Sequence, residues 1–173
     1  VQAVAVAEYL ERTRGLKVGV VDITLFRPFP GDLLGPVLKG KKGVAVLERT
    51  DQPLAEDLPL MREVRAALGK CLENGRAEGE RPWPAYDSYG KLSDLPPLYS
   101  GVYGLGSRDL QPEGIIAAVE NMLPDGRHRR RYYLGIDFVR EPANPKEEVH
   151  LQRLLEAYPE IGDYALRGSE NPD

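Results

Sequence analysis

LYSGVYGLGSRDLQPEGIIAAVENML, residues 98–123, is the stretch that decides the fold class. Leu98–Val102 follows two prolines and ends before a glycine-rich turn, which predicts a short strand. Gly104–Ser107 forms the turn, Pro112 opens a helix, and Pro124 and Gly126 end it. The helix carries one apolar stripe, made of Ile115, Ile116, Val119, Met122 and Leu123. A strand, a turn and a helix in this order are the repeating unit of an α/β domain.

Three further stretches have the composition of strands: Leu16–Phe26, Val44–Leu47 and Arg131–Ile136. Leu16–Phe26 is apolar on both alternate sets of residues, so we predict a central strand covered on both faces. Between the strands we predict helices near residues 3–10 and 33–38, and one with Pro59 in its first turn. That helix aligns Met61, Val64, Leu68 and Cys71, so Cys71 is expected in the core. The pattern predicts a three-layer α/β/α domain with an open, mostly parallel sheet.

The remaining chain suggests how the protein is organised. Residues 74–97 lose all periodicity and collect glycine and proline, which predicts an irregular insertion. After Arg140, Asn144-Pro145 predicts the start of a helix, with an apolar side made of Leu151, Leu154, Leu155 and Tyr158. Residues 162–173 are polar and predict a linker. We therefore expect a domain at 1–140 and a helical connector at 141–173 that leads to a further domain. Since the chain begins at Val1, both ends are expected to be cut from a longer protein.

Composition argues against several classes of function. The 23 Lys and Arg against 27 Asp and Glu give a net charge of -4, which offers no general attraction to nucleic acid or to an anionic membrane. The basic run Arg127–Arg131 is interpreted as a solvated turn. Cys71 is the only cysteine, and His128 and His150 lack metal-ligand spacing, so no metal site is expected. Without a membrane-spanning or signal segment, we expect a cytoplasmic protein.

Candidate ligand contacts are few. Gly101, Gly104, Gly106 and Ser107 lie between a strand and a helix, where backbone amides could hold an anion. The alternative is a plain tight turn, which is favoured because the spacing matches no phosphate-binding motif. Arg27, fixed before Pro28, could bind a ligand with two hydrogen bonds or bridge to a carboxylate of its own domain. An acidic cluster follows Val44–Leu47 without a paired nucleophile or base, so we interpret it as loop or helix-start acids: Glu48, Asp51, Glu56 and Asp57.

Three aromatic residues lie in the irregular insertion: Trp83, Tyr86 and Tyr89. Large aromatic groups in an exposed loop often anchor an interface with another protein. The alternative is that the insertion folds back and buries them on its own domain. The sequence leaves both interpretations open.

Four ordered blocks of the sequence resemble a known family. They are Val18–Val20 leading to Leu25–Phe29, then Val46–Thr50, then Gly101–Ser107 with its Pro112 helix, and Leu134–Asp137. Together they are similar to domain II of the pyruvate:ferredoxin/flavodoxin (2-oxoacid:acceptor) oxidoreductases. The resemblance implies a fold like the C-terminal domain of transketolase. Phe138-Val139-Arg140 departs from the family pattern after the last block, which leaves the substrate open.

The resemblance also implies a parent enzyme that oxidatively decarboxylates a 2-oxoacid to acyl-coenzyme A. That enzyme uses thiamine diphosphate with magnesium and passes electrons through iron–sulfur clusters to ferredoxin or flavodoxin. Its other domains and a dimer mate would be the partners of this chain. No catalytic residue of the family transfers to this sequence, so the chain alone is expected to be an inactive structural domain. The rival hypotheses are a free-standing anion- or nucleotide-binding module and a protein-interaction module that uses Trp83.

Overall fold

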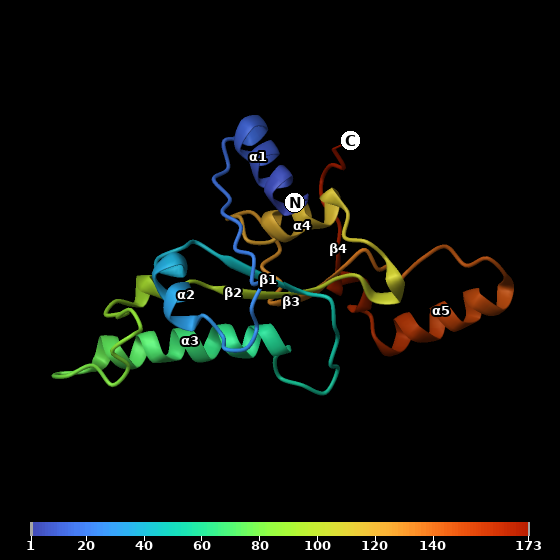
Figure 1. The fold of residues 1–173 in the computed structure, drawn as a ribbon. Coiled ribbons are helices and arrows are strands. Elements are labelled where there is room, and N and C mark those ends of the chain that lie inside the picture. Colours follow the sequence, from blue (N-terminus) through green and yellow to red (C-terminus); the bar gives the residue numbers. More distant parts are fainter. Residues whose placement is uncertain (1, 173) are drawn as a thin grey trace.

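A computed structural model describes residues 2–172 and shows an open sheet with helices on both faces (Figure 1). Four parallel strands lie in the order β1 (Val44–Glu48), β2 (Leu98–Val102), β3 (Arg131–Leu134) and β4 (Ala165–Leu166). Glu48 lies opposite Val102, and Val102 lies opposite Tyr133. The strands predicted at Val44–Leu47, Leu98–Val102 and Arg131–Ile136 are confirmed. Strand β3 ends two residues earlier than predicted, at Leu134, before Gly135, which has φ +70°.

Five α-helices and three short 3-10 helices surround this sheet within the described residues. Helices α2 and α3 cover one face and helices α1 and α4 cover the other, which confirms the three-layer α/β/α prediction (Figure 1). Their bounds are α1 Gln2–Arg14, α2 Gly31–Leu38, α3 Pro59–Arg76, α4 Pro112–Glu120, α5 Pro145–Ala157, η1 Leu92–Asp94, η2 Leu105–Ser107 and η3 Ile161–Tyr164.

The first face of the sheet packs against α3. Pro59 occupies the first turn of this helix, as the sequence predicts. The helix buries its predicted stripe, Met61, Val64, Leu68 and Cys71, against Val46 of β1 and Leu98 of β2. Leu34 and Leu38 of α2 join the same cluster. Because neighbouring residues of a strand point to opposite faces, Tyr99 faces away from this cluster.

The second face packs against α4, which in turn carries α1. Tyr132 and Leu134 of β3 meet Ala117 and Ala118 of α4. On its other side α4 buries Ile116 against Leu10 of α1 in a separate cluster. Complete burial of a side chain such as Leu10 contributes about 2 kcal/mol. Helix α1 thus packs on α4 rather than directly on the sheet.

The prediction of a central strand at Leu16–Phe26 is wrong. Residues 16–26 are extended but do not pair with the sheet, and with the turn that follows they form a crossing segment (residues 16–30) between α1 and α2 (Figure 1). Leu16 and Val18 pack with α1 and α4, whereas Ile23 and Phe29 pack with α2 and α3. The apolar residues on both alternate sets suggested burial on both faces. In the structure, some of these apolar side chains pack against the two helical layers and the others are exposed to solvent.

The predicted linker at residues 162–173 contains the fourth strand. Ala165 and Leu166 pair with β3, and the tail then lies along α4, where a side chain at Gly168 would collide with the carbonyl of Glu113. The backbone N–H of Ser169 donates to Glu120 at 3.0 Å. A two-residue strand has no periodicity for the sequence to reveal. The domain division at residue 140 therefore stays a prediction, with part of the expected connector inside the sheet.

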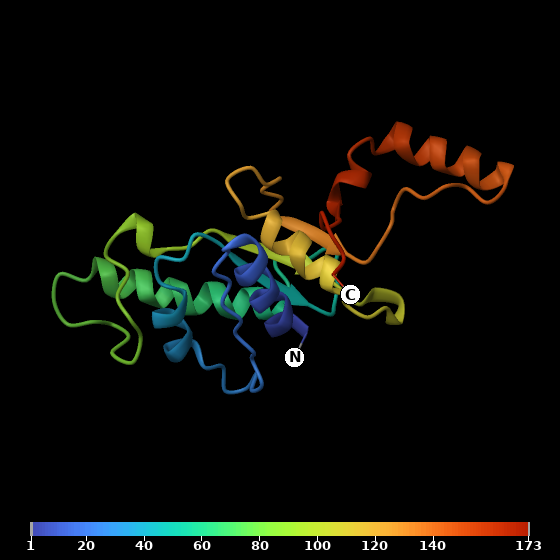
Figure 2. The same cartoon turned by 90° about the horizontal axis from the view of Figure 1, so that it is seen from above.

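Helix α5 begins as predicted, because the side chain of Asn144 accepts hydrogen bonds from the N–H groups of Lys146 and Glu147. The helix projects from the rest of the domain (Figure 2) and buries none of its residues. Along its predicted apolar side the leucines are half-buried and Tyr158 is exposed.

Helix α4 ends earlier than predicted, at Glu120. The side chain of the next residue, Asn121, forms hydrogen bonds with the backbone N–H and carbonyl of Arg129.

We expect the thiol of Cys71 to react slowly with thiol reagents in the folded protein. The residue is fully buried in the α3 cluster, and burial raises the pKa of its thiol, so little thiolate forms at pH 8. Labelling with a chromogenic disulfide reagent should be at least about a hundredfold slower in native than in urea-unfolded protein, because reaction requires local opening. Equal rates would contradict the burial of this side chain.

Candidate functional site

The carboxyl ends of the strands form the edge at which parallel α/β sheets usually place their sites. Three loops meet there: residues 49–58 after β1, 103–111 after β2 and 135–144 after β3. The acidic cluster and the glycine turn singled out in the sequence both lie on these loops. This edge is therefore the first candidate for a functional site.

Glu48 is the buried carboxylate of this edge, with 7% of its surface exposed. It accepts hydrogen bonds from the backbone N–H groups of Leu60 at 2.6 Å and of Met61 at 3.1 Å. These N–H groups belong to the first turn of α3, where no helical carbonyl can pair them. The N-cap residue of that helix, Leu58, makes no side-chain bond. Glu48 therefore caps α3 from the neighbouring strand.

Asp51 connects the loop after β1 to strand β3. Its two carboxylate oxygens accept from Arg131 at 3.0 Å and from the hydroxyl of Tyr133 at 3.1 Å. Arg131 also donates to the carbonyls of Gln52 and Ala55. Burial, reinforced by the bond to Asp51, raises the pKa of the Tyr133 hydroxyl, so it stays protonated and acts as a donor. The carboxylate of Asp51 is thus fully engaged in holding the loop over the sheet.

The other two acids of the cluster have ordinary surroundings. Asp57 forms an ion pair with Arg65 of α3 at 2.6 Å, and Glu56 is exposed to solvent. No nucleophile or base is placed beside either carboxylate in the described part of the chain. The interpretation of the cluster as loop and helix-start acids is in agreement with these contacts.

The glycine turn follows β2 in a left-handed conformation. Gly104, Gly106 and Ser107 have φ angles of 69°, 66° and 61°. A side chain at Gly104 would collide with the side chain of Arg49, so glycine is needed there for close packing as well as for its backbone angle. Gly101, inside β2, leaves room for Leu47 and Tyr132. The turn is exposed at Gly106 and Ser107.

Arg27 is held away from the glycine turn by its own partners. Its guanidinium donates to Glu63 of α3 at 2.8 Å and to the carbonyl of Phe26, and it stacks 4.3 Å from the centre of the Phe26 ring. The glycine turn instead packs on Arg49. The structure therefore does not combine Arg27 with Gly104, Gly106 and Ser107 into one site, and their role in ligand binding stays a prediction.

The insertion at residues 74–97 folds back onto α3. The side-chain amide of Asn74 donates to the carbonyls of Trp83, Tyr86 and Asp87, and its oxygen accepts from the N–H of Trp83 at 2.9 Å. Tyr89 is buried in the α3 cluster and donates to the carbonyl of Gly35 at 2.6 Å. Tyr86 is half-buried, whereas Trp83 keeps 38% of its surface exposed. Of the three interface candidates, Trp83 is the most exposed, although Lys70 and Tyr86 lie against its ring.

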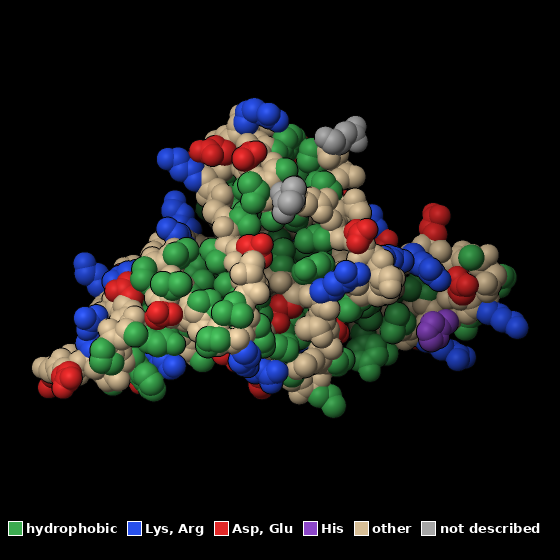
Figure 3. All heavy atoms as spheres, viewed as in Figure 1, with side chains coloured by type: hydrophobic (Ala, Val, Ile, Leu, Met, Phe, Trp, Pro, Cys, Tyr) green, Lys and Arg blue, Asp and Glu red, His purple; other side chains and the backbone are tan. Residues whose placement is uncertain are grey.

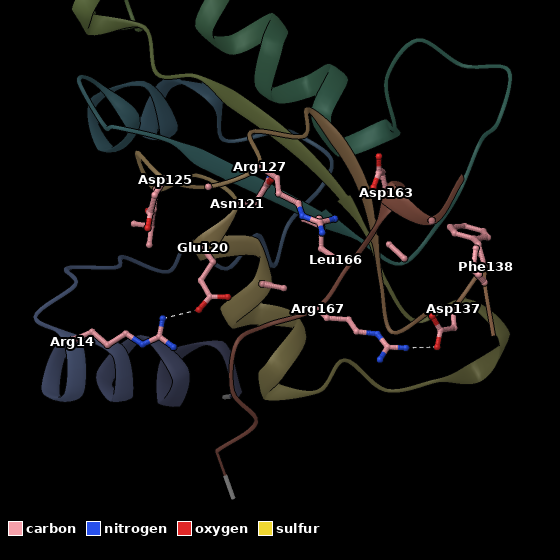
Figure 4. A pocket seen from close by; sticks show the side chains of 16 residues that line it. Arg14, Glu120, Asn121, Asp125, Arg127, Asp137, Phe138, Asp163, Leu166 and Arg167 are labelled. Carbon is pink, nitrogen blue, oxygen red and sulfur yellow. Dashed lines mark hydrogen bonds and ion pairs between the residues drawn. The ribbon is translucent and has the colours of Figure 1, made fainter. Parts of the chain in front are cut away.

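A cleft of about 540 Å³ lies beside β4, and no sequence pattern indicated it (Figure 4). It lies between the end of α4, the loop after β3 and the returning tail. Ion pairs cross its walls: Arg14 with Glu120 at 2.7 Å, and Arg167 with Asp137. Three arginines and four carboxylates line it, so the cleft has no net attraction for an anion. It exists only because β4 pairs with β3, which no sequence pattern indicated.

Two general features complete the description of residues 2–172. No group of three or more histidine, cysteine, aspartate or glutamate side chains in this range is arranged to hold a metal ion. Within the same range, no helix has the length and apolar character required to cross a membrane.

Comparison with known proteins identifies the family. Residues 2–77 match the family model for the pyruvate:ferredoxin oxidoreductase core domain II. The chain is also 34% identical over 125 residues to the probable pyruvate-flavodoxin oxidoreductase of Escherichia coli (strain K12). The chain belongs to the pyruvate:ferredoxin/flavodoxin oxidoreductase domain II family. The family predicted from the four sequence blocks is thereby confirmed.

This domain II accounts for a small share of its relatives. The match with the Escherichia coli protein covers 72% of this chain and 9% of the relative. The pyruvate synthase subunit PorA of Thermotoga maritima is 38% identical over 130 residues, which cover 72% of this chain and 26% of PorA. The pyruvate:ferredoxin oxidoreductase of Moorella thermoacetica is 30% identical over 63% of this chain and 8% of its own length. The chain is thus comparable to one domain or part of a subunit of these proteins.

We expect Glu48→Ala to destabilise domain II by about 1–3 kcal/mol, because it leaves two N–H groups of α3 without an acceptor. Glu48→Gln, which keeps an oxygen but loses the charge, should fall between the wild type and Glu48→Ala. Urea unfolding followed by circular dichroism measures the change. Glu56→Ala in the same loop is the control and should change stability by less than about 0.5 kcal/mol. Equal effects of the two alanine variants would refute the capping role.

We expect Asn74→Ala to release the insertion while α3 remains folded. The substitution removes four hydrogen bonds to residues 83–87, and exposed segments without such bonds are cut first by proteases. Limited trypsin digestion should cleave the variant after Arg76, at the start of the insertion, at least about tenfold faster than the wild type. Lys91 lies outside the bonded stretch and serves as the internal reference site.

Proposed function

We propose that this chain is a non-catalytic structural domain of a thiamine-diphosphate-dependent pyruvate (2-oxoacid):ferredoxin oxidoreductase. The parent enzyme would oxidatively decarboxylate a 2-oxoacid to acyl-coenzyme A, with ferredoxin or flavodoxin as the electron acceptor. The observation that carries the proposal is that three of the four acids in the cluster at the carboxyl edge are engaged in internal bonds. Glu48 caps α3, Asp51 holds Arg131 and Tyr133, and Asp57 pairs with Arg65.

The donor set of this chain does not fit the cofactors that the family implies. An iron–sulfur cluster is usually held by several thiolates, whereas the single thiol here, Cys71, is buried among the side chains of α3. A magnesium ion that carries a diphosphate takes oxygen ligands, and three of the four carboxylates of the cluster, those of Glu48, Asp51 and Asp57, are already bonded within the chain. We therefore assign thiamine diphosphate, magnesium, the clusters and coenzyme A to other parts of the parent enzyme.

The partners of the chain follow from the same proposal. They would be the other domains of the parent enzyme and its dimer mate, since the relatives extend far beyond the matched residues. Residues 1–140 would form the domain and residues 141–173 the connector, in a cytoplasmic protein. The 2-oxoacid itself is left open.

A second candidate is a free-standing module that binds an anion or a nucleotide. It is favoured by the left-handed, solvent-exposed turn at Gly104, Gly106 and Ser107. Against it, α4 begins only at Pro112, and Asp109 and Glu113 place negative charge beside the start of that helix. Titration with coenzyme A and with adenine nucleotides separates this candidate from the structural role.

We expect the isolated chain to bind no thiamine diphosphate and to reduce no electron acceptor. Calorimetric titration with thiamine diphosphate and Mg²⁺ should show no heat of binding, and a 2-oxoacid-dependent dye-reduction assay should show no turnover. The parent oxidoreductase is the positive control for both measurements. Turnover by the pure chain would overturn the structural role, whereas tight binding of coenzyme A without turnover would assign Arg27 or the Gly104–Ser107 turn to ligand contact.

A further inference from the structure

The crossing segment and α2 together expose a continuous stretch of apolar side chains. Space-filling shows hydrophobic side chains gathered over α2 and the segment that precedes it (Figure 3). Six of the thirteen exposed large hydrophobic residues in the described chain lie between residues 20 and 37. We call them the α2 patch: Val20, Val21, Leu25, Phe26, Leu33 and Val37. We propose that the α2 patch is the surface on which domain II docks against another part of the parent oxidoreductase.

The patch is too concentrated to be a random scatter of surface residues. Leu33 exposes 68% of its surface and Leu25 exposes 55%. Single exposed hydrophobic residues are normal on soluble proteins, but contiguous groups of this kind mark surfaces that another molecule covers. Leu33 and Val37 are one helical turn apart, so they lie on the same side of α2, next to the side that carries the buried Leu34 and Leu38. Helix α2 is thus apolar on two sides while only one of them meets the core.

The backbone of the crossing segment supports the same conclusion. From Lys17 to Leu25, no backbone N–H or carbonyl group forms a hydrogen bond within the described residues. Water can satisfy these groups while the segment is exposed, but a covering surface must supply partners for them. An extended apolar segment of this kind is suited to pair with an extended segment of another domain.

The charges around the patch indicate the chemistry of the partner. Arg27 is already engaged with Glu63 and with the ring of Phe26. Asp22 and Asp32 lie within the patch region and have no ion pair or hydrogen bond in the described structure. The complementary surface is therefore apolar at its centre and carries lysine or arginine side chains opposite these two carboxylates.

The partner is another part of the parent enzyme rather than a second copy of this chain. Within residues 20–37 the charged side chains are Asp22, Asp32 and Arg27, and Arg27 is paired with Glu63. The same patch of a second copy would therefore offer no unpaired lysine or arginine to the two carboxylates. The patch also lies entirely within residues 2–77, the part that matches the family model, and the relatives continue well beyond that part. This choice of partner rests on the proposed function.

Hydrogen exchange of the isolated chain and of the parent oxidoreductase tests the proposal. In the isolated chain the amides of residues 17–27 should exchange at nearly the rate of an unfolded peptide. In the parent enzyme they should exchange at least about tenfold more slowly, because the covering surface pairs the backbone. Equal exchange in the two proteins would show that nothing covers the segment and would overturn the proposal.

Matched variants in the parent enzyme locate the effect. Leu33→Asp combined with Val37→Asp should abolish the protection of residues 17–27, since both side chains are exposed in the domain itself and buried only on docking. Leu92→Asp, which alters a still more exposed leucine outside the patch, is the control and should leave the protection intact. Circular dichroism of the isolated variants should match the wild type, and protection that survives the double substitution would contradict the docking surface.

Two further readouts separate this proposal from the proposed function. Concentration-dependent protection of residues 17–27 in the isolated chain would mean that a second copy covers the patch, which would overturn the choice of partner. Thiamine-diphosphate-dependent dye reduction by the parent enzyme tests the proposed function independently of exchange. A parent that protects the segment but lacks this activity would leave the docking surface in place and refute the assigned reaction.

Discussion

The packing of Tyr132 against Gly101 is the contact on which the arrangement of layers depends. A side chain at Gly101 would lie 2.5 Å from Leu47 and 2.7 Å from the ring of Tyr132, well inside van der Waals contact. The missing side chain allows the fully buried ring of Tyr132 to lie across β2 and to meet α4. Helix α4 in turn supports α1, so two helices depend on the absence of one methyl group in the central strand.

The carboxyl edge illustrates how an α/β scaffold can occupy its usual site with structural bonds. In many parallel sheets this edge presents carboxylates and backbone amides to a ligand. Here Glu48 supplies the capping hydrogen bonds that the N-cap residue of α3 does not make. Asp51 accepts hydrogen bonds from the guanidinium of Arg131 and the hydroxyl of Tyr133. Each acid stabilises the start of a helix or the course of a loop. Charged residues at this edge are thus compatible with a domain whose task is to hold its shape.

The sequence predicted the parts of the fold that rest on local patterns. Val44–Leu47 and Leu98–Val102 are short apolar runs, and Pro59 and Asn144 mark helix starts, so strands and helices appear where expected. The acidic cluster was interpreted as loop or helix-start acids, which fits Glu56 and Asp57, whereas the burial of Glu48 in β1 depends on its contact with the distant start of α3. The prediction of a strand at residues 16–26 was wrong for a physical reason. Apolar residues on both sides of an extended segment suit a buried strand, and they equally suit a segment that joins two helical layers. The cleft and β4 could not be predicted, since a two-residue strand has no periodicity and its pairing with β3 joins residues far apart in the sequence.

The same tail contacts have a consequence for the architecture of any longer polypeptide. Tyr9 donates to Glu170 at 2.7 Å and Arg14 pairs with both Glu120 and Glu170, so the first helix and the last described residues are fastened side by side (Figure 1). A domain whose two ends meet can be placed within a longer chain as a loop-like insertion, with little displacement of what lies on either side. Sequence added before or after this domain would leave from the α1 side. Changes in the length of the α5 projection, which lies between β3 and β4, would not alter where those flanking segments begin.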